Sequence, residues 1–441
     1  VALYVYFPYH WVNACVRGDI SELLASSFFF WVLWSIDILG DDLSDRKSIY
    51  SAGLLGSFFY AAILLSHNIT SLIFSGFLTI YCIAHFYRSK KACSLVTVMI
   101  MGGLGLACFF WLPAFIEKKY VGVESLLRDA PFWEHYVYPQ QLFIPSYGFG
   151  GSVSGLSDGM SFNVGLFHWV MALVGLYLLI KRRWAVSFYR MGWIHGLGLC
   201  VLLVMMTPVS YIVWKMTPLF PFVMYPWRLL SLVAIPLVFL SVMSFDKLLS
   251  GRPSRYINLV LLLSIIAIVA LIFPYWGKSR HILYDPQVLS RQIVWNIEHQ
   301  TGTYGTTMSN EYLPKTVIQM PEQPSSYPVL YENLEWVSNL QIEAQNGSYG
   351  QYQINSDIER KIIINRFLFP GWQVKVNGNS VPMSSTRNGL IQVVVPAGQS
   401  IIEVSWGRTR TRTIAEWISI ISILGWLGLA WRSVKIKTEL T

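Results

Sequence analysis

The chain has 441 residues, of which 54% are hydrophobic and 13% are charged, and it contains 18 Trp, 24 Tyr and 25 Phe. Soluble domains are typically about 25% charged, so this composition excludes an ordinary soluble protein and indicates an integral membrane protein. The net charge of +9 does not indicate a nucleic-acid partner, because the Lys and Arg residues alternate with apolar segments and form no single patch.

Nine apolar segments, most of them close to twenty residues long, are able to cross a hydrocarbon core of about 30 Å. They lie near residues 22–39, 50–66, 70–86, 94–112, 162–180, 191–206, 226–245, 257–275 and 414–431. The sequence therefore predicts an α-helical multispanning membrane protein with about nine helices. Because the chain begins at Val1 without Met or a signal-peptide pattern, we expect further residues upstream.

The basic residues in the short loops predict the orientation of these segments. All loops agree with the positive-inside rule if the following residues face the cytoplasm: Arg46, Lys47, Arg88, Lys90, Lys91, Lys181 to Arg183, Lys247, Arg252, Arg255, Arg432, Lys435 and Lys437. The other loops, including the long stretch before the last helix, then face outward. That stretch contains no cysteine and needs no disulfides, which suits a protein of the bacterial cytoplasmic (inner) membrane.

The first outer segment, PYHWVNACVRGDISE at residues 8–22, gathers four ionisable residues before an apolar run: His10, Arg17, Asp19 and Glu22. On a helix starting near Val12, Asp19 and Glu22 would share one face. Two carboxylates there could hold a divalent metal ion, or one could act as a general base. The alternative is a helix start, with Asp19 and Ser21 as caps and Glu22 in the first turn. The spacing leaves both interpretations open.

His67 and Asn68 form a second outer feature, a turn between two predicted helices. A histidine in such a turn is more often a hydrogen-bonded structural residue than a ligand. His10 and His67 could converge with two further outer histidines, His135 and His168. No pair of them has a metal-ligand spacing such as H-x-x-x-H, so the pattern does not favour a zinc site.

The outer loop 113–161 mixes aromatic, charged and glycine residues and is predicted to lie along the membrane surface. Glu117 and Lys118 follow the run FFWLPAF, where they either anchor the helix end or, for the lysine, contact a lipid phosphate. Asp158 lies in GFGGSVSGLSDGMSF, a run that lacks the strand and helix of a nucleotide-binding loop. We interpret Asp158 as a helix cap or a polar group of an outer site.

The run MYPWRLL gives a sharper candidate. Pro226 and Trp227 begin a helix at the predicted outer surface, and Arg228 lies one residue inside it. Burying a guanidinium alone is costly, so Arg228 must pair with a carboxylate or an anion. Its fork of donors matches a phosphate group, and we interpret it as a candidate phosphate-binding residue.

The predicted organisation has three parts. Residues 1–275 form a helical membrane domain with the loop 113–161, residues 276–413 form an extracytoplasmic β-rich domain, and residues 414–441 form a final transmembrane helix and cytoplasmic tail. The inserted domain opens with an amphipathic helix in DPQVLSRQIVWNIEHQ, whose apolar face includes Val288. The runs KIIINRFLF, WQVKVNG, LIQVVVPAG and SIIEVSW then predict an antiparallel sheet or sandwich.

Several runs of the chain resemble a known family. These are PYHWVNACVRGDISE, SHN, FFWLPAFIEKKYV, GGSVSGLSDGMSFNVG, YPWR and EYLP. They resemble the bacterial multispanning membrane proteins known as 6-pyruvoyl-tetrahydropterin synthase-related, over most of the chain. The later runs LFPGWQVKVNG and VPAGQSIIEV also look like the outer β domain of related membrane glycosyltransferases. The histidine set of a pterin synthase is absent, so the family name does not describe the chemistry.

The resemblance implies a GT-C-like fold and a membrane glycosyltransferase. Such an enzyme takes a sugar from a polyprenyl-phosphate donor at the outer leaflet and passes it to an envelope polymer or protein. By that analogy Asp19 or Glu22 would be the base or a metal ligand, and Arg17, Arg228 or Lys118 would bind the phosphate. The usual first-loop acid of these enzymes would lie upstream of Val1.

Two other functions remain open in the sequence. The chain could be a non-catalytic scaffold or subunit of a membrane complex, or it could be a transporter or flippase. A transporter is less favoured, because polar residues gather at the outer mouth and not around a midplane site. Asp37 is the main acidic exception within the predicted spans.

Overall fold

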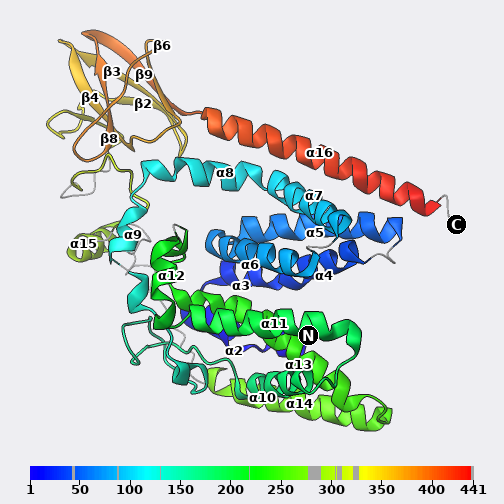
Figure 1. Cartoon of the computed structure of the whole chain (residues 1–441). Coiled ribbons are helices and arrows are strands. Elements are labelled where there is room, and N and C mark those ends of the chain that lie inside the picture. Colours follow the sequence, from blue (N-terminus) through cyan, green and yellow to red (C-terminus); the bar gives the residue numbers. More distant parts are fainter. Residues whose placement is uncertain are drawn as a thin grey trace. The chain divides into compact units, whose positions relative to one another are not determined.

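The structure is a computed structural model of the chain and describes residues 1–41, 45–86, 89–129, 131–217, 219–276, 290–302, 304, 310–320 and 327–438 (Figure 1). Its contacts define two compact units. The first, called here the membrane unit, comprises Val1–Trp111, Ala130–His281 and Ile418–Thr441. The second, the β unit, comprises Leu112–Asp129 and Ile282–Trp417, so it includes the start of the loop predicted at 113–161. Residues 277–289, with Val288 of the predicted amphipathic face, lie outside the described residues.

The helices follow the apolar segments of the sequence. The first half of the chain forms α1 (Ala2–Val5), α2 (Pro8–Trp11), a π-helical turn (Val12–Arg17), α3 (Ile20–Ser27), α4 (Phe29–Gly40), α5 (Arg46–Ser66), α6 (Asn68–Phe86), α7 (Lys90–Leu106), α8 (Cys108–Glu117) and α9 (Glu124–Asp129). The rest forms α10 (Leu166–Ile180), α11 (Val186–Met205), α12 (Tyr211–Met216), α13 (Leu230–Leu249), α14 (Ser254–Trp276), α15 (Arg291–Thr301) and α16 (Arg410–Thr438).

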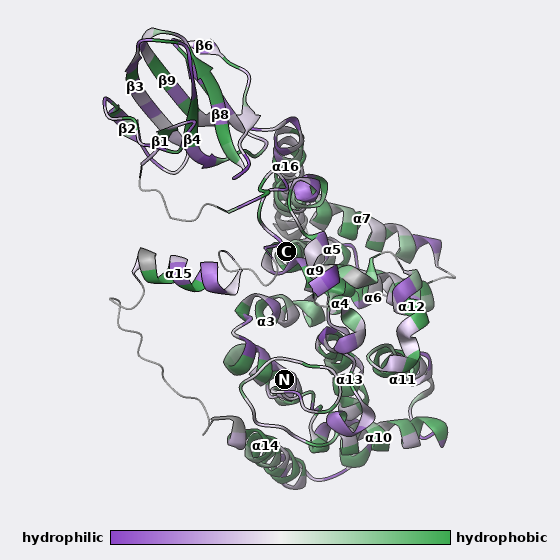
Figure 2. Ribbon diagram, turned by 90° about the vertical axis from the view of Figure 1, so that its left-hand side faces the viewer, coloured by the Kyte–Doolittle hydropathy of each residue, from purple (hydrophilic) through white to green (hydrophobic). Residues whose placement is uncertain are grey.

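The described residues contain seven helical spans that are long and apolar enough to cross a membrane, or eight if a bent pair counts as one. The bent pair is α7 with the helix after it, which turn by 75° between Leu106 and Cys108 where we predicted one span at 94–112. The predicted span at 162–180 is the shorter helix α10, of 15 residues. The chain is thus a mostly helical, multi-pass membrane protein, as its composition predicted, and Figure 2 shows the apolar surface of these helices.

The last helix packs against the break between α7 and α8. The Phe109 N–H donates to the Ser419 hydroxyl oxygen at 2.9 Å, and that hydroxyl donates to the Gly105 carbonyl at 3.0 Å. The Trp426 indole also donates to the Leu54 carbonyl on α5 at 3.0 Å. Backbone groups near the bend therefore gain partners on α16, which explains how a break is tolerated at membrane depth.

Contacts between helix ends define two ends of the membrane unit. At one end His67, which joins α5 to α6, approaches Asp19 before α3, and we call this the Asp19 end. At the other end the Arg190 guanidinium near the start of α11 donates to the Ala84 carbonyl near the end of α6. Since α10 and α13 pack together and both run away from the Asp19 end, their last residues lie at the opposite end.

The β unit holds two antiparallel sheets. Its strands are β1 (Val329–Tyr331), β2 (Gln341–Gln345), β3 (Tyr349–Ser356), β4 (Arg360–Phe367), β5 (Trp372–Val376), β6 (Asn379–Ser380), β7 (Ser384–Ser385), β8 (Leu390–Val395) and β9 (Gly398–Trp406). The strand orders are β1-β4-β8-β7 and β2-β3-β9-β5-β6. Alternating side chains, coloured in turn along β3 and β9 in Figure 2, meet in a core that includes Tyr352, Ile362 and Val404. All four runs predicted as strands are confirmed.

The helix predicted before this sheet is confirmed over Arg291–Thr301 as α15. The Ser290 hydroxyl caps it by accepting the Ile293 N–H at 3.4 Å. Its predicted apolar face is not buried in the described structure, because Ile293, Val294 and Ile297 are all exposed.

Candidate functional site

The local backbone around residues 12–22 is not the single helix that placed Asp19 and Glu22 on one face. The π-helical turn ends at Arg17, and Gly18 takes a left-handed conformation at φ 65°, which glycine adopts without strain. Asp19 then caps α3, since its Oδ1 accepts the Glu22 N–H at 3.0 Å and the Ser21 hydroxyl at 2.7 Å. That prediction of one continuous helix is wrong, and the helix-start alternative describes the geometry.

Glu22 is fully buried and accepts three hydrogen bonds. Its Oε1 accepts the Tyr9 hydroxyl at 2.8 Å and the Asn13 amide at 3.2 Å. Its Oε2 lies 2.7 Å from Nη1 of Arg17. A buried carboxylate is costly unless it is paired and hydrogen-bonded, and here both conditions are met.

Arg17 joins the two acids. Its Nη2 donates to Oδ2 of Asp19 at 2.8 Å, while Nη1 also donates to the Asn13 side-chain oxygen. The guanidinium lies 4.7 Å from the centre of the Trp227 ring, which favours a cation. Burial alone would lower the pKa of Arg17, but Tyr9, Glu22 and Asp19 outweigh it and raise that pKa. Arg17 is therefore a permanent positive charge between two carboxylates.

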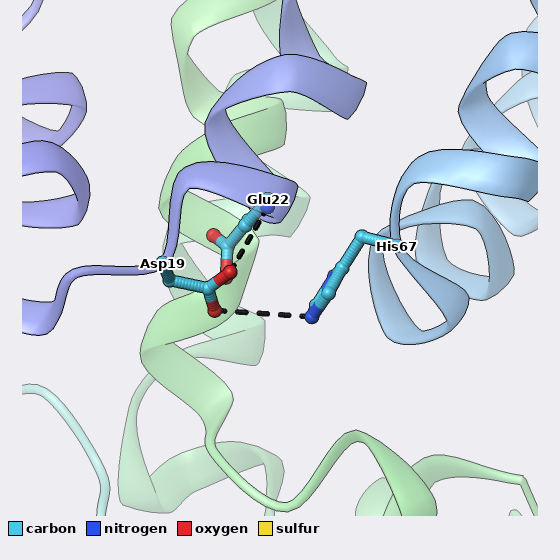
Figure 3. A group of neighbouring side chains, drawn as sticks. All are labelled: Asp19, Glu22 and His67. Atoms are coloured by element: carbon cyan, nitrogen blue, oxygen red, sulfur yellow. Dashed lines mark hydrogen bonds and ion pairs between the residues drawn. The ribbon is translucent and has the colours of Figure 1, made fainter. Parts of the chain in front are cut away.

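His67 approaches Asp19 from the facing helix, as Figure 3 shows, with its Nε2 at 3.8 Å from Oδ2. Its Nδ1 accepts the Thr70 backbone N–H at 3.1 Å and contacts the Thr70 hydroxyl at 2.7 Å. A backbone amide can only donate, so the proton of the neutral ring resides on Nε2. Burial lowers the pKa of His67, against the opposite effect of Asp19 and Glu22, which favours this neutral form.

We define the Asp19 cluster as Tyr9, Asn13, Arg17, Asp19, Glu22 and His67. Potential metal ligands of Asp19, Glu22 and His67 lie within 4.8 Å of one another. In this arrangement the three groups do not fit a divalent cation, because Arg17 neutralises the carboxylates and Nε2 of His67 carries a proton. The arrangement holds a guanidinium in place of a metal, and the mechanism below uses no metal.

The carboxylate of Asp19 keeps its charge in this setting. Burial would raise its pKa, but the Ser21 hydroxyl, the Glu22 N–H and the charge of Arg17 together lower that pKa below its ordinary value. The side chain of Asp19 is 17% exposed, whereas that of Glu22 is 0% exposed. Asp19 is consequently the acid of the pair that an outside molecule can reach.

Arg228 lies at the start of α13 and is 9% exposed. Its Nη1 donates to the Val223 carbonyl at 3.0 Å, and its guanidinium lies 5.0 Å from the centre of the Tyr225 ring. Its Nε is buried with no hydrogen-bond partner among the described residues. Glu22 and Arg17 interact electrostatically with it, so Arg228 belongs to the surroundings of the Asp19 cluster. Two guanidinium groups thus face two carboxylates, with one donor left unused.

The remaining predicted residues have structural partners elsewhere. Asn68 begins α6, where its backbone carbonyl accepts the Ser71 hydroxyl at 2.7 Å. Asp158 accepts the Gln141 amide at 2.6 Å and the Val153 N–H at 2.9 Å, which agrees with the interpretation as a polar group that shapes a loop.

Glu117 and Lys118 belong to the β unit. Glu117 is buried and accepts the Arg412 guanidinium at 2.7 Å and the Thr409 hydroxyl at 2.6 Å. Lys118 lies with its ammonium 4.7 Å from the centre of the Phe115 ring. The contacts of these two residues lie within that unit and do not connect them to the Asp19 cluster.

His10 is buried 6% exposed between the rings of Tyr4 and Phe7, and its Nε2 has no partner among the described residues. Burial lowers the pKa of His10 from 6.5 to about 4. The folded protein therefore resists a proton that the unfolded chain accepts below pH 6.5.

This difference predicts that acid destabilises the protein through His10. Above pH 6.5 the ring is neutral in both states, so stability does not depend on it. Lowering the pH from 7 to 5 should cost about 2 kcal/mol, because only the unfolded chain gains the proton. His10→Phe should remove most of this loss in thermal unfolding of the detergent-solubilised protein. His299→Phe, on the exposed helix α15, is the control; equal pH dependence in both variants would contradict the assignment.

Sequence reasoning missed three members of this region: Tyr9, Asn13 and Trp227. Tyr9 and Asn13 precede Arg17 by eight and four residues, and a four-residue repeat of polar side chains on a helical segment could have revealed them. Trp227 was assigned only to the helix start, and no sequence signal places it under Arg17.

The chain matches no protein-family model, no curated protein and no solved structure at a significant level. The functional argument accordingly depends on the geometry of the Asp19 cluster and Arg228.

Proposed function

We propose that the protein is a GT-C-like membrane glycosyltransferase. It transfers a sugar from a polyprenyl-phosphate donor to a cell-envelope acceptor at the Asp19 end of the membrane unit. The observation that carries this proposal is the buried guanidinium of Arg228, whose Nε has no partner among the described residues, beside an acid that solvent reaches. A donor without a partner in a buried setting is costly, and a phosphate oxygen would satisfy it.

In the proposed reaction Asp19 accepts the proton of an acceptor hydroxyl. The acceptor oxygen then forms a bond to the anomeric carbon of the sugar, and the bond from that carbon to the phosphate oxygen breaks. The electron pair leaves with the polyprenyl phosphate, whose growing negative charge Arg228 stabilises. General-base catalysis of this kind contributes about 10² to 10⁴ in rate.

Glu22 and Arg17 are positioning residues in this scheme. Glu22 is fully buried and holds Arg17, and Arg17 in turn holds Oδ2 of Asp19 at 2.8 Å. The arrangement leaves the phosphate to Arg228 and keeps Asp19 ionised. The proposal places the Asp19 end at the outer leaflet of a bacterial cytoplasmic membrane, with the β unit outside the cytoplasm as a contact for the acceptor.

The direct test is donor binding by Arg228. A photoreactive polyprenyl phosphate should label the wild-type protein in detergent, and Arg228→Gln should reduce labelling at least tenfold, since a charge-assisted hydrogen bond contributes about 1.5–3 kcal/mol. Arg228→Lys, which keeps the charge near Glu22, should label at an intermediate level. Arg252→Gln, at the opposite end of the membrane unit, is the control. Wild-type labelling of a folded Arg228→Gln protein would remove the phosphate role.

A second function, a non-catalytic scaffold in a membrane complex, is favoured by the complete pairing of Glu22. A fully buried and balanced cluster also stabilises helix packing without turnover. The two functions differ in the expected effect of removing the Asp19 charge, which the Discussion develops.

A further inference from the structure

A basic pocket lies between the last turns of α10 and α13, at the end of the membrane unit opposite the Asp19 end. Its volume is about 400 Å³, and it is lined by Tyr177, Leu178, Lys181, Arg183 and Lys247. Three of these five residues are cations, and none is an acid. No ion pair of the three cations occurs within the part of the chain that the structure describes.

A tight turn after α10 holds two of the cations in place. The Lys181 N–H donates to the Tyr177 carbonyl at 2.9 Å, and the Arg183 N–H donates to the Leu178 carbonyl at 2.8 Å. Arg182 between them has a left-handed conformation at φ 54°. The next residue, Trp184, is buried, and its ring fills the space where a Cβ on Gly192 would lie, 2.3 Å away. Lys181 and Arg183 are therefore presented by an anchored turn.

Cations at helix C-termini are expected, because the helix dipole favours them there. That effect acts on each helix separately and does not require cations of two helices to line one cavity. Lys247 comes from the last turn of α13, whereas Lys181 and Arg183 follow α10. Three like charges around one cavity repel one another, and an anion in the cavity would offset this repulsion.

The surface beside the pocket is apolar. Leu173, Tyr177 and Ile180 are each more than half exposed and follow one another at four and three residues, so they form one stripe along α10. The stripe runs from the pocket along a helix of the membrane unit. A ligand that satisfies both features has an anionic head and hydrocarbon chains.

We propose that this pocket binds the phosphate headgroup of an anionic phospholipid, with its acyl chains along the exposed stripe of α10. Basic pockets between the ends of transmembrane helices recognise such headgroups. The pocket is separate from the Asp19 cluster, so this inference does not depend on the glycosyltransferase proposal. The apolar stripe favours a lipid over free phosphate, which shares the same headgroup chemistry.

The test measures retention of phosphatidylglycerol by the full chain. The protein is reconstituted in phosphatidylcholine nanodiscs with increasing phosphatidylglycerol, and bound lipid is counted by native mass spectrometry after release. Lys181→Gln/Arg183→Gln/Lys247→Gln should weaken retention on the order of 100-fold, at about 1 kcal/mol per cation. The matched control replaces two lysines and one arginine at the same end, Arg46→Gln/Lys47→Gln/Lys90→Gln, and should retain lipid like the wild type.

Two outcomes would overturn the proposal. One is equal retention by the pocket variant and the control, and the other is displacement of the lipid by millimolar inorganic phosphate, which would assign the pocket to the free anion. Lys247→Arg keeps all three charges and should retain lipid even if the triple variant fails to fold; loss of lipid in a folded Lys247→Arg protein would also contradict the proposal.

Discussion

Replacing Arg17 by glutamine should lower the free energy of unfolding by about 3–5 kcal/mol, the typical cost of leaving one partner of a buried ion pair uncompensated. Glu22 is 0% exposed and would keep only the Tyr9 and Asn13 donors. Asp19 would lose its contact at 2.8 Å. Chemical or thermal unfolding of the detergent-solubilised protein measures the effect.

The double variant Arg17→Gln/Glu22→Gln should recover most of that stability, because it removes the buried charge together with its partner. Arg128→Gln is the matched control, since the Arg128–Asp129 pair is exposed and such pairs contribute little. If the single and double variants lost the same stability, Arg17 would act by packing on Trp227 and not by compensating Glu22.

Asp19→Asn should reduce sugar transfer by about 10² to 10⁴ while the protein remains folded, if Asp19 is the general base. Asparagine caps a helix about as well as aspartate, so the hydrogen bond from the Glu22 N–H is kept and only the charge is lost. The assay follows transfer of labelled hexose from a polyprenyl-phosphate donor to envelope acceptors in membrane vesicles.

Asp45→Asn is the matched control for this substitution. Asp45 also caps a helix, α5, by accepting the Ser48 N–H at 2.6 Å, but it lies at the opposite end of the membrane unit. Wild-type transfer by a folded Asp19→Asn protein would refute the catalytic role. If the wild type itself transfers no sugar and Asp19→Asn changes only stability, the scaffold function would gain support.

The outcome for Glu22 differs from the expectation that both acids are equivalent candidates. Because Glu22 is buried and bonded to Arg17, Glu22→Gln should affect folding as well as activity. A loss of activity in that variant is therefore informative only with a measurement of stability. Asp19, which is partly exposed and keeps its cap as asparagine, gives the cleaner test.

The sequence by itself determined the class and the elements of this protein. Apolar runs of membrane length became helices, and β-branched runs divided by Pro-Gly and Asn-Gly became β4, β5, β8 and β9. These features depend on local composition and period, which a sequence states directly. The ionisable residues between 8 and 22 also identified the region of the cluster.

Only the tertiary structure decided how those residues meet. The left-handed Gly18 breaks the helix that a regular spacing predicted, and His67, 48 residues after Asp19, reaches the same carboxylate from another helix. The structure also assigned Glu22 to the interior and left Nε of Arg228 without a partner among the described residues. Burial and pairing arise from side chains far apart in the chain, so a local pattern cannot distinguish an accessible acid from a buried one.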